Sequence, residues 1–329
     1  MDITVILCTY NRCNLLATAL ESIAASEMPA GTRWEVLVVD NNSRDRTREV
    51  VEGFSHEHPG RFRYLFEAKP GKSYALNSGV RDSGGEVLAF MDDDVTVERT
   101  WLRDLTGAID GEKWAGAGGR IILQWPDSLP KWMSCDGPYA RHPFPGFDQG
   151  REAKQLVGPP FGTNMAFHKG VFAKYGGFRT DLGPEPGSEI RAEDTEFGRR
   201  VIAGGEHLRY EPSAIVYHPV PAARIRKDFF LRWRFDYGRG EAREFPPAPM
   251  HLLCSLAAWT LRWIVSFDPR TRFFRKLIVW EKAGAVLELR HQIFETKPKR
   301  NKPLYRRTPM GQPEPASSHN TVTTGSRKR

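Results

Sequence analysis

The first half of the chain alternates short apolar runs with segments that carry apolar residues at helical spacing. The pattern predicts strands at residues 3–8, 35–40, 62–66 and 87–91, and helices at residues 15–25, 46–54 and 73–80. Strands and helices that alternate at this spacing indicate a mostly parallel sheet with helices on both faces. The run EVLVVD is apolar almost throughout, as expected of a strand buried on both faces. The fold class is therefore α/β.

The second half of the chain has a less regular pattern. Residues 124–160 are rich in Pro, Gly, Trp and Phe without a clear period. This composition predicts a long loop region, and loops of that length are usually functional or disordered. Helical spacing returns at residues 193–203 and in two further stretches, 224–244 and 250–295. Beyond residue 297 the chain is polar, basic and proline-rich, which predicts a disordered tail.

Polar clusters follow three of the predicted strands. TYNR (residues 9–12) follows the first strand, DNNSRD (residues 40–45) the second and DDD (residues 92–94) the fourth. Parallel strands bring their carboxyl ends to one edge of a sheet, where open α/β sheets bind ligands. We therefore expect a ligand site at this edge.

The triplet Asp92, Asp93 and Asp94 places three carboxylates next to one another. Their mutual repulsion requires a counter-charge, most simply a divalent cation. Mg2+ and Mn2+ prefer oxygen ligands and commonly bind through one or two carboxylates together with substrate phosphates. A solvated acidic turn is the other interpretation, and the buried strand before the triplet disfavours it.

Two other polar segments are ambiguous by themselves. The short side chains at residues 40–45 can bond a nucleotide base or ribose, but they equally suit a turn and a helix N-cap. Gly71 and the predicted helix start near Ser73 form a candidate seat for a phosphate or a sugar.

A second acidic pair begins the predicted helix at residues 193–203. Glu193 and Asp194 there also favour the helix dipole. A hydroxyl group is a poor nucleophile until a base removes its proton, and either carboxylate could serve as that base. His218 follows a predicted strand, and its position could return it to the acidic triplet, although a single histidine is more often structural.

Six segments, in this order, resemble glycosyltransferase family 2, whose members have the GT-A fold. They are TYNR (9–12), VVDNNSRDRT (38–47), KPGKSYALNSG (69–79), FMDDDV (90–95), FGTNMAFHK (161–169) and AEDTEFGRR (192–200). The resemblance runs from residue 3 to residue 218. It implies a Rossmann-like, mostly parallel central sheet flanked by helices. It also implies an inverting enzyme that moves a sugar from a nucleotide-diphosphate sugar to an acceptor hydroxyl during synthesis of a polysaccharide, glycolipid or other cell-surface glycan.

The resemblance implies a role for each matching residue. Asp194 would be the catalytic base, with Glu193 beside it. Mg2+ or Mn2+ would be held by Asp94 and Asp92 of a DXD motif and by His218. The nucleotide-sugar donor would be bound by Thr9, Tyr10, Asn11, Arg12, Asp40, Asn42, Lys72, Asn77, Asp92, Asp93, Gly162, Thr163 and Asn164.

The chain is expected to divide into three parts. Residues 1–222 would form the catalytic domain, with a nucleotide-sugar half at about 1–123 and an acceptor half at about 124–222. A basic amphipathic helical region (223–296) and the tail (297–329) would follow as a C-terminal extension. The net charge of +8 is uneven, because residues 221–329 hold 23 Lys and Arg against 9 Asp and Glu, a net of +14. Such asymmetry indicates an anionic partner.

The basic helical region has two interpretations. Arg and Lys alternate with aromatic residues at 224–243, and residues 250–267 are largely apolar. This pattern is typical of an amphipathic helix at the surface of an anionic membrane. The family resemblance implies that such binding would suit a lipid-linked acceptor sugar. The pattern equally fits helices that pack on the catalytic domain, and the sequence leaves both open.

Other function classes explain less of the sequence. A nucleic-acid-binding protein would use the basic third, but the acidic clusters would repel phosphates, so no nucleic-acid partner is expected. A nucleotide-sugar-binding scaffold without turnover is the other alternative, and the acids at 92–94 and 193–194 favour an enzyme over it. A dinucleotide dehydrogenase is disfavoured because no GxGxxG motif follows the first strand.

The cysteines and the N-terminus bear on location. The four cysteines form no CxxC motif, the first strand does not have the pattern of a signal peptide, and no uncharged apolar run reaches 18 residues. We expect a cytoplasmic protein, peripheral on the inner face of the cell membrane if the basic helices bind lipid.

Overall fold

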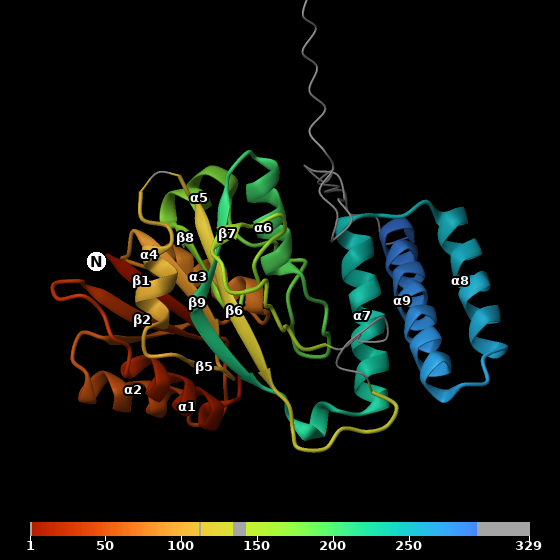
Figure 1. Ribbon diagram of the computed structural model, residues 1–329, viewed down its shortest axis with the longest axis horizontal. Helices are drawn as coiled ribbons and strands as arrows, with labels where there is room; N and C mark the ends of the chain where they lie inside the picture. The colour runs from red at the N-terminus through yellow and green to blue at the C-terminus, as the bar shows by residue number, and fades with distance from the viewer. Residues whose placement is uncertain (1, 112, 134–142, 295–329) are drawn as a thin grey trace, which may run out of the picture.

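A computed structural model describes residues 2–111, 113–133 and 143–294. One sheet runs through its larger part, with strand order β3-β2-β1-β4-β8-β6-β9-β5 and β7 paired to β9 (Figure 1). The strands are β1 (Ile3–Thr9), β2 (Trp34–Asp40), β3 (Phe62–Phe66), β4 (Val87–Asp92), β5 (Thr96–Val97), β6 (Gly116–Gln124), β7 (Lys154–Gln155), β8 (Met165–His168) and β9 (Leu208–Pro219).

The first half of the sheet is parallel, as the sequence predicts. Strand β1 pairs in parallel with β2 and β4, and β2 pairs in parallel with β3. The register sets Thr9 opposite Asp40 and Cys8 opposite Asp92. The three polar clusters therefore begin at the same edge of the sheet.

The second half of the sheet mixes both directions, which the sequence pattern did not predict. Strand β8 is antiparallel to β4 and β6, while β6 and β9 are parallel. Strand β6 opens with GAGG, a composition that suggests a turn rather than a strand. The reason for glycine is a close approach: a Cβ on Gly119 would lie 2.4 Å from the side chain of Asn164 and 2.3 Å from the carbonyl of Ala214.

Helices cover both faces of the sheet. One face packs α1 (Cys13–Ala24), α2 (Thr47–Glu57) and α4 (Trp101–Gly107) on side chains such as Val5 and Leu7. The other face packs α3 (Lys72–Asp82), α5 (Lys169–Tyr175) and α6 (Glu193–Ala203) on Ile6 and Phe90. These layers confirm the expected α/β class.

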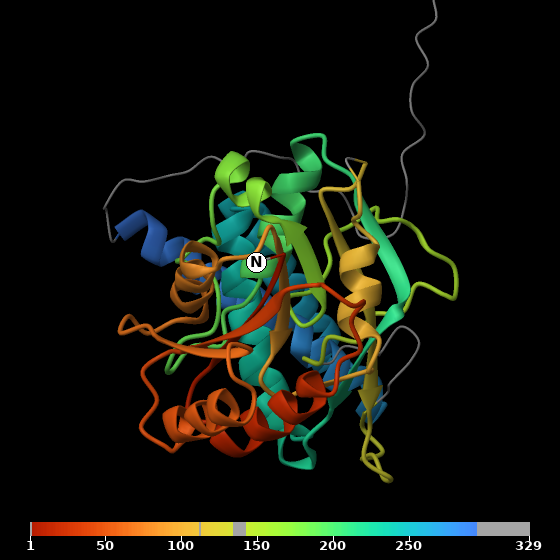
Figure 2. The same cartoon turned by 90° about the vertical axis from the view of Figure 1, so that its left-hand side faces the viewer.

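Three helices follow the sheet. A short 3-10 turn, η2 (Ala222–Arg224), leads into α7 (Lys227–Glu244), α8 (Pro249–Ile264) and α9 (Pro269–Phe294). They stand in a row beside the sheet in Figure 1, with α9 in the middle, and lie behind the sheet in the view of Figure 2. Helices α7 and α9 approach backbone to backbone, because a Cβ on Gly238 would lie only 1.9 Å from the carbonyl oxygen of Glu281.

The expected helical stretch at 250–295 is two helices rather than one. Pro269 has no N–H to continue the hydrogen-bond ladder of α8. Asp268 instead accepts a hydrogen bond from the backbone N–H of Thr271 at 2.7 Å, which caps α9.

Three further sequence predictions concern the C-terminal tail, the loop region 124–160 and the domain boundary. The expected disordered tail at 297–329 lies outside the described residues, as do residues 134–142 of the expected loop region. The described remainder of 124–160 contains the short strand β7 and otherwise turns and loops. The division of the chain at residue 222 stays a prediction.

Candidate active site

Two adjoining cavities lie at the edge of the sheet where the polar clusters meet. The triplet chamber has a volume of about 350 Å3 and is lined by Tyr10, Arg12, the acidic triplet, His218 and Arg224. The α6 chamber has a volume of about 280 Å3 and is lined by Glu193 and Asp194 at the start of α6, by Phe161 and Thr163, and by Trp233 and Tyr237 of α7. Lys72 and Asp92 line both chambers.

An ion pair between Lys72 and Asp92 marks the junction of the two chambers. The Lys72 Nζ lies 2.6 Å from Oδ1 of Asp92 and 3.6 Å from Oε1 of Glu193. Burial opposes the charged form of Lys72, but the carboxylates of Asp92, Glu193 and Asp194 outweigh it and raise the lysine's pKa. Burial likewise opposes the charged form of Asp92, and Lys72 reverses the effect and lowers its pKa. Both groups are therefore charged at neutral pH.

Asp93 lies in the wall of the triplet chamber, where its buried carboxylate holds the loop after β1. Its Oδ2 accepts a hydrogen bond from Thr9 Oγ1 at 2.7 Å, and its Oδ1 accepts one from Arg12 Nη1 at 2.8 Å. Burial raises the pKa of Asp93 to about 6 in spite of Arg12, and the neighbouring Asp94 adds to the rise. Thr9 and Asp93 thus position Arg12 at the chamber wall.

Asp94 faces His218 across the triplet chamber. Oδ1 of Asp94 lies 3.9 Å from Nε2 of His218. The other ring nitrogen, Nδ1, lies 3.0 Å from the backbone carbonyl of Pro219, a contact that suits an Nδ1–H donor. In that tautomer Nε2 carries the lone pair that a metal ion would use.

The chamber suits a cation that also binds substrate. A carboxylate oxygen and an imidazole nitrogen face each other there, which fits Mg2+ or Mn2+. Within the described ranges, no group of three or more His, Cys, Asp and Glu side chains is arranged to hold a metal. A cation at Asp94 and His218 would therefore take its remaining ligands from substrate oxygens and water, as these ions commonly do.

The loop after β1 is joined to the loop after β2. The backbone N–H of Asn11 donates to Ser43 Oγ at 2.8 Å, and its side-chain oxygen accepts from the N–H of Arg44 at 2.7 Å. Asn11 has φ 52°, in the left-handed region that asparagine tolerates. Tyr10, the residue before it, has 42% of its surface exposed and presents its ring at the triplet chamber.

Six of the thirteen predicted donor contacts lie outside both linings, namely Asn11, Asp40, Asn42, Asn77, Gly162 and Asn164. Asp40 is buried, and its carboxylate accepts hydrogen bonds from the N–H of Ser43 and the hydroxyl of Tyr64. Asn42 is exposed in a left-handed turn at φ 69°. The neighbouring Asn41 lines the triplet chamber instead.

Two asparagines that were predicted to bind the donor form hydrogen bonds within the fold instead. Asn77 of α3 donates to the carbonyl and accepts from the N–H of Phe178, each at 2.8 Å. Asn164 is fully buried, binds the carbonyls of Arg120 and Ala214, and accepts the indole N–H of Trp101. Neither amide lines either chamber, because backbone groups take up its hydrogen-bonding capacity.

Asp194 lies in the α6 chamber at the first turn of α6. Its Oδ2 accepts the backbone N–H of Gly162 at 2.6 Å, and its Oδ1 accepts that of Thr195 at 2.7 Å. A Cβ on Gly162 would lie 3.0 Å from Oδ2, so glycine allows this approach. The next residue, Thr163, donates its hydroxyl to Asp92 at 2.6 Å. Residues 162–163 thus connect Asp194 to the junction.

Glu193 sits behind Asp194 and is almost fully buried. Burial raises its pKa to about 7, with Lys72 opposing the rise and Asp194 adding to it. Ala192, just before it, has φ 91°, a conformation that costs a non-glycine residue roughly 1–3 kcal/mol. Such strain is typical of functional sites. Here the strained backbone at Ala192 orients the side chains of Glu193 and Asp194 at the start of α6.

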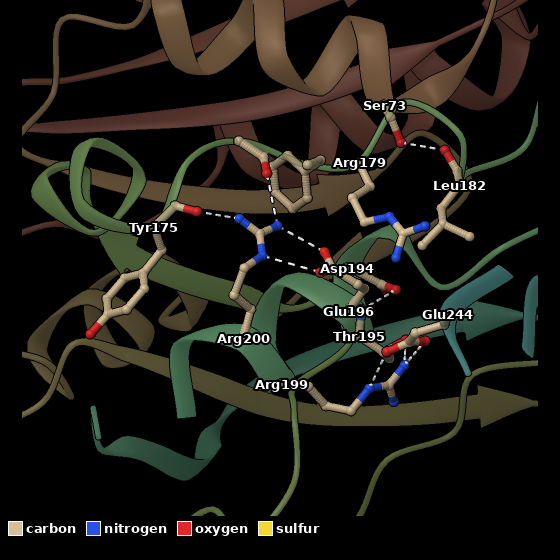
Figure 3. A network of polar contacts seen from close by, with 12 residues as sticks. Ser73, Tyr175, Arg179, Leu182, Asp194, Thr195, Glu196, Arg199, Arg200 and Glu244 are labelled. Atoms are coloured by element: carbon tan, nitrogen blue, oxygen red, sulfur yellow. Dashed lines mark hydrogen bonds and ion pairs between the residues drawn. The ribbon is translucent and has the colours of Figure 1, made fainter. Parts of the chain in front are cut away.

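Helix α6 is fixed on two sides by arginines (Figure 3). Arg200 pairs with Glu196 one turn earlier and donates to the backbone carbonyls of Tyr175 and Gly177. Arg199 Nε donates to Glu244 of α7 at 2.7 Å, and this Glu244 carboxylate is buried. The position of Asp194 therefore depends on α7 as well as on the sheet.

Several lining residues were missed by the sequence reasoning. Trp233 and Tyr237 of α7 lie with ring centroids 6.0 Å apart and wall the α6 chamber. They belong to the basic, aromatic stretch 224–243. Its sequence fits a helix at a membrane surface and a helix packed on the catalytic domain equally well. Arg191 lines both chambers, and Arg224 Nη1 lies 3.9 Å from Asp94. No local motif marked these residues, since tertiary contacts alone bring them to the site.

The chain is similar to known proteins in sequence. A family model described as "Glycosyl transferase family 2" matches residues 4–176. The succinoglycan biosynthesis protein ExoM of Rhizobium meliloti is 29% identical over 244 residues, which cover 74% of this chain and 75% of that protein. Glycosyltransferase AglE of Haloferax volcanii is 26% identical over 271 residues, or 82% of each chain.

The fold is similar to those of solved structures. The mannosyltransferase PcManGT from Pyrobaculum calidifontis, in complex with GDP-Man and Mn2+, matches with a TM-score of 0.58 at 16% identity, covering 90% of this chain and 88% of that one. Residues 1–349 of Staphylococcus aureus TarS match with a TM-score of 0.51 at 14% identity, covering 90% and 92%. These likenesses confirm the expected GT-A fold.

Proposed function

The chain belongs to glycosyl transferase family 2 and is a glycosyltransferase, and we propose that it transfers a sugar from a nucleoside diphosphate sugar to an acceptor hydroxyl with inversion. One observation carries this proposal. The acidic triplet and Asp194 line adjoining chambers that share the Lys72–Asp92 ion pair. The sugar would lie at that junction, with its leaving group on one side and the acceptor on the other.

The donor would occupy the triplet chamber. Arg12, Lys72 and Arg224 supply positive charge at its wall, which suits a diphosphate. The half-exposed ring of Tyr10 offers a surface on which a nucleotide base can stack. Asn41 rather than Asp40 or Asn42 would provide the polar contact from the loop after β2.

A divalent cation, Mg2+ or Mn2+, would be held by Asp94 and His218. When bound, such an ion neutralises the charge that develops on a departing diphosphate. Arg12 and Arg224 lie 3.2 Å and 3.9 Å from the Asp94 carboxylate. Both would neutralise part of the same diphosphate charge. The solved mannosyltransferase in the same fold class contains Mn2+ with GDP-Man, which supports the assignment by likeness of fold.

Asp194 would act as the general base. The acceptor oxygen attacks the anomeric carbon, and the bond from that carbon to the diphosphate oxygen breaks with its electron pair on the diphosphate. The acceptor proton passes to the Asp194 carboxylate as the new bond forms. The N–H groups of Gly162 and Thr195 hold that carboxylate in place. Attack from the side opposite the leaving group inverts the anomeric centre.

The acceptor would occupy the α6 chamber. Trp233, Tyr237 and Phe161 give it an aromatic wall, and Asp194, Arg191 and Arg199 give it polar groups. Aromatic faces with a few polar contacts are suited to the apolar faces and hydroxyl edges of a sugar ring. We therefore assign the acceptor as a sugar or a lipid-linked sugar.

The relatives suggest the biological setting. ExoM is named for succinoglycan biosynthesis, and TarS is a poly(ribitol-phosphate) N-acetylglucosaminyltransferase. We infer a role in synthesis of a cell-envelope glycan, with the reaction in the cytoplasm. Cys8, Cys13 and Cys254 are free thiols, which suits a reducing compartment.

The direct test is release of nucleoside diphosphate from a panel of nucleotide sugars, with Mn2+, Mg2+ or EDTA and with mixed oligosaccharide and lipid-linked acceptors. We expect metal-dependent release with one nucleotide class, increased by one acceptor and lowered about 10²–10⁴-fold in Asp194→Asn. Metal-dependent donor binding without turnover with any acceptor would favour a nucleotide-sugar-binding scaffold instead.

A further inference from the structure

Helix α8 presents an apolar stripe to its outer side. Met250, Leu253, Leu261, Ile264 and Val265 each have at least half of their surface exposed, between 50% and 73%. Their spacing of three, eight, three and one residues places them on one side of the helix. The opposite side carries Leu252, which is buried against α9. Figure 1 shows α8 as the outermost of the three C-terminal helices.

The turn between α8 and α9 extends this apolar surface. Phe267 at the turn has 94% of its surface exposed, the largest value among the exposed large apolar residues that the structure describes. Buried Ser266 and half-buried Arg275 brace the turn, because Arg275 donates to the Ser266 hydroxyl and to the carbonyl of Arg262, each at 2.8 Å. An aromatic ring is thus held out from a rigid turn.

Positive charge gathers at the C-terminal end of the stripe and around the turn. Arg262, Arg270 and Arg272 are exposed, and α8 itself contains no acidic residue. Asp268 is the acid of the turn, and its carboxylate caps α9. Trp263 and Trp280 are half-buried beside them, with the Lys276 ammonium 5.6 Å and 4.9 Å from their rings. Apolar side chains, tryptophans and cations at one surface are typical of the water–lipid boundary.

We propose that the outer face of α8 and the Phe267 turn bind an anionic lipid surface. This inference goes beyond the sugar transfer proposed above and does not depend on it. The positive charge favours lipid over a second copy of the chain as the partner of this surface. A second copy would bring these arginines against their equivalents, whereas anionic lipid head groups complement them. None of the helices in the described part of the chain has the length and hydropathy of a membrane span. We place the contact at the lipid interface, where amphipathic helices lie.

The structure also separates two roles within the basic C-terminal region. Helices α7 and α9 bury Phe230, Trp233, Leu277 and Leu289, which fits the packing interpretation. Helix α8 contacts α9 but leaves its other side uncovered. Lipid binding is therefore assigned to α8 and its turn, and not to the aromatic stretch of α7.

The test is co-sedimentation of the full chain with phosphatidylcholine vesicles, with and without phosphatidylglycerol. We expect binding at least tenfold stronger to the anionic vesicles. The double variant Leu261→Gln, Ile264→Gln and the single variant Phe267→Ser should each lose about tenfold or more in binding, because they remove apolar insertion. Arg262→Gln with Arg272→Gln should remove the preference for anionic lipid.

The control is Val157→Ser, which changes a residue that is 78% exposed and lies away from α8. It should bind within about twofold of the wild type, and all variants should keep their thermal unfolding midpoints, since every substituted side chain is exposed. Equal binding by the Leu261→Gln, Ile264→Gln variant would overturn the proposal. So would a wild-type dimer in light scattering that this variant converts to a monomer.

Discussion

The ammonium of Lys72 lies 2.6 Å from the carboxylate of Asp92 where the triplet chamber meets the α6 chamber. One lysine therefore balances charge on both sides of the candidate reaction centre, because Glu193 Oε1 is also 3.6 Å away. The pair comes from the start of α3 and the end of β4, two elements brought together by the parallel sheet. We therefore expect a substitution of Lys72 to change both the stability of the fold and the activity.

Replacing Lys72 should affect both properties. Lys72→Met leaves Asp92 and Glu193 without their shared cation, and leaving charged groups unpaired at this partly buried site should cost about 1–3 kcal/mol. We expect that loss in chemical denaturation, together with loss of nucleoside diphosphate release. Lys69→Met, an exposed lysine on the same loop, is the matched control and should change neither by more than about 0.5 kcal/mol or twofold. Equal stability of the two variants would contradict the assignment of the charge centre.

Asp194→Asn should separate binding from chemistry. The amide keeps the size of the side chain but cannot accept the acceptor's proton, so turnover should fall by about 10²–10⁴-fold while donor affinity stays within about threefold. Steady-state kinetics and calorimetry measure the two quantities. Glu57→Gln, an exposed change at the end of α2, provides the control. Near-normal turnover in Asp194→Asn would remove that residue from the role of base.

Glu193 should make stability depend on pH. Burial raises the pKa of Glu193 to about 7 from its ordinary value of 4.5, so between those values the native state holds a proton that the unfolded state has released. The contribution is fully present below about pH 4.5 and is lost as pH rises through about 7, with a slope of at most about 1.4 kcal/mol per pH unit. Denaturation of wild type and Glu193→Gln from pH 5 to 8 measures it. The variant should lack this part of the slope, and identical slopes would show that Glu193 ionises normally.

Trp233 should affect the acceptor and not the donor. Trp233→Leu removes part of the aromatic wall of the α6 chamber and leaves the triplet chamber intact. We expect the KM for the acceptor to rise about tenfold, in line with a stacking contact of roughly 1–3 kcal/mol, at constant donor affinity. Trp114→Leu, just before β6, whose ring lies against His207, controls for general loss of a tryptophan. A matching change in donor affinity would place Trp233 in a different role.

The sequence predicted the part of the site that local patterns encode. The strands before Thr9, Asp40 and Asp92 and the start of α6 at Glu193 follow from apolar runs and turn residues, and parallel pairing brings their ends together. The pattern could not show which polar side chains face the cavity. Asn77 and Asn164 bind backbone groups of Phe178, Arg120 and Ala214, partners between 44 and 101 residues away in the chain. Such contacts depend on tertiary packing, which no local pattern records.

The C-terminal third illustrates the same limit. The basic, aromatic pattern of α7 and the apolar pattern of α8 look alike as membrane helices. Trp233 of α7 nonetheless lines the α6 chamber, whereas Phe267 after α8 is 94% exposed. Gly238 and Gly284 let α7 and α9 approach closely, and α8 packs on α9 as the outermost of the three helices (Figure 1).

The most direct test of a metal-dependent donor site is calorimetry of nucleotide sugars with wild type and Asp94→Ala, each with Mn2+, Mg2+ or EDTA. His218→Gln is a second variant at the same cation, and Glu57→Gln is the surface control. We predict that wild type binds one class of nucleotide sugar only with the metal present. Asp94→Ala should lose at least tenfold in that affinity and should keep its fold by circular dichroism. Donor binding of equal strength with EDTA, or in Asp94→Ala with metal, would contradict the assignment of the cation to Asp94 and His218.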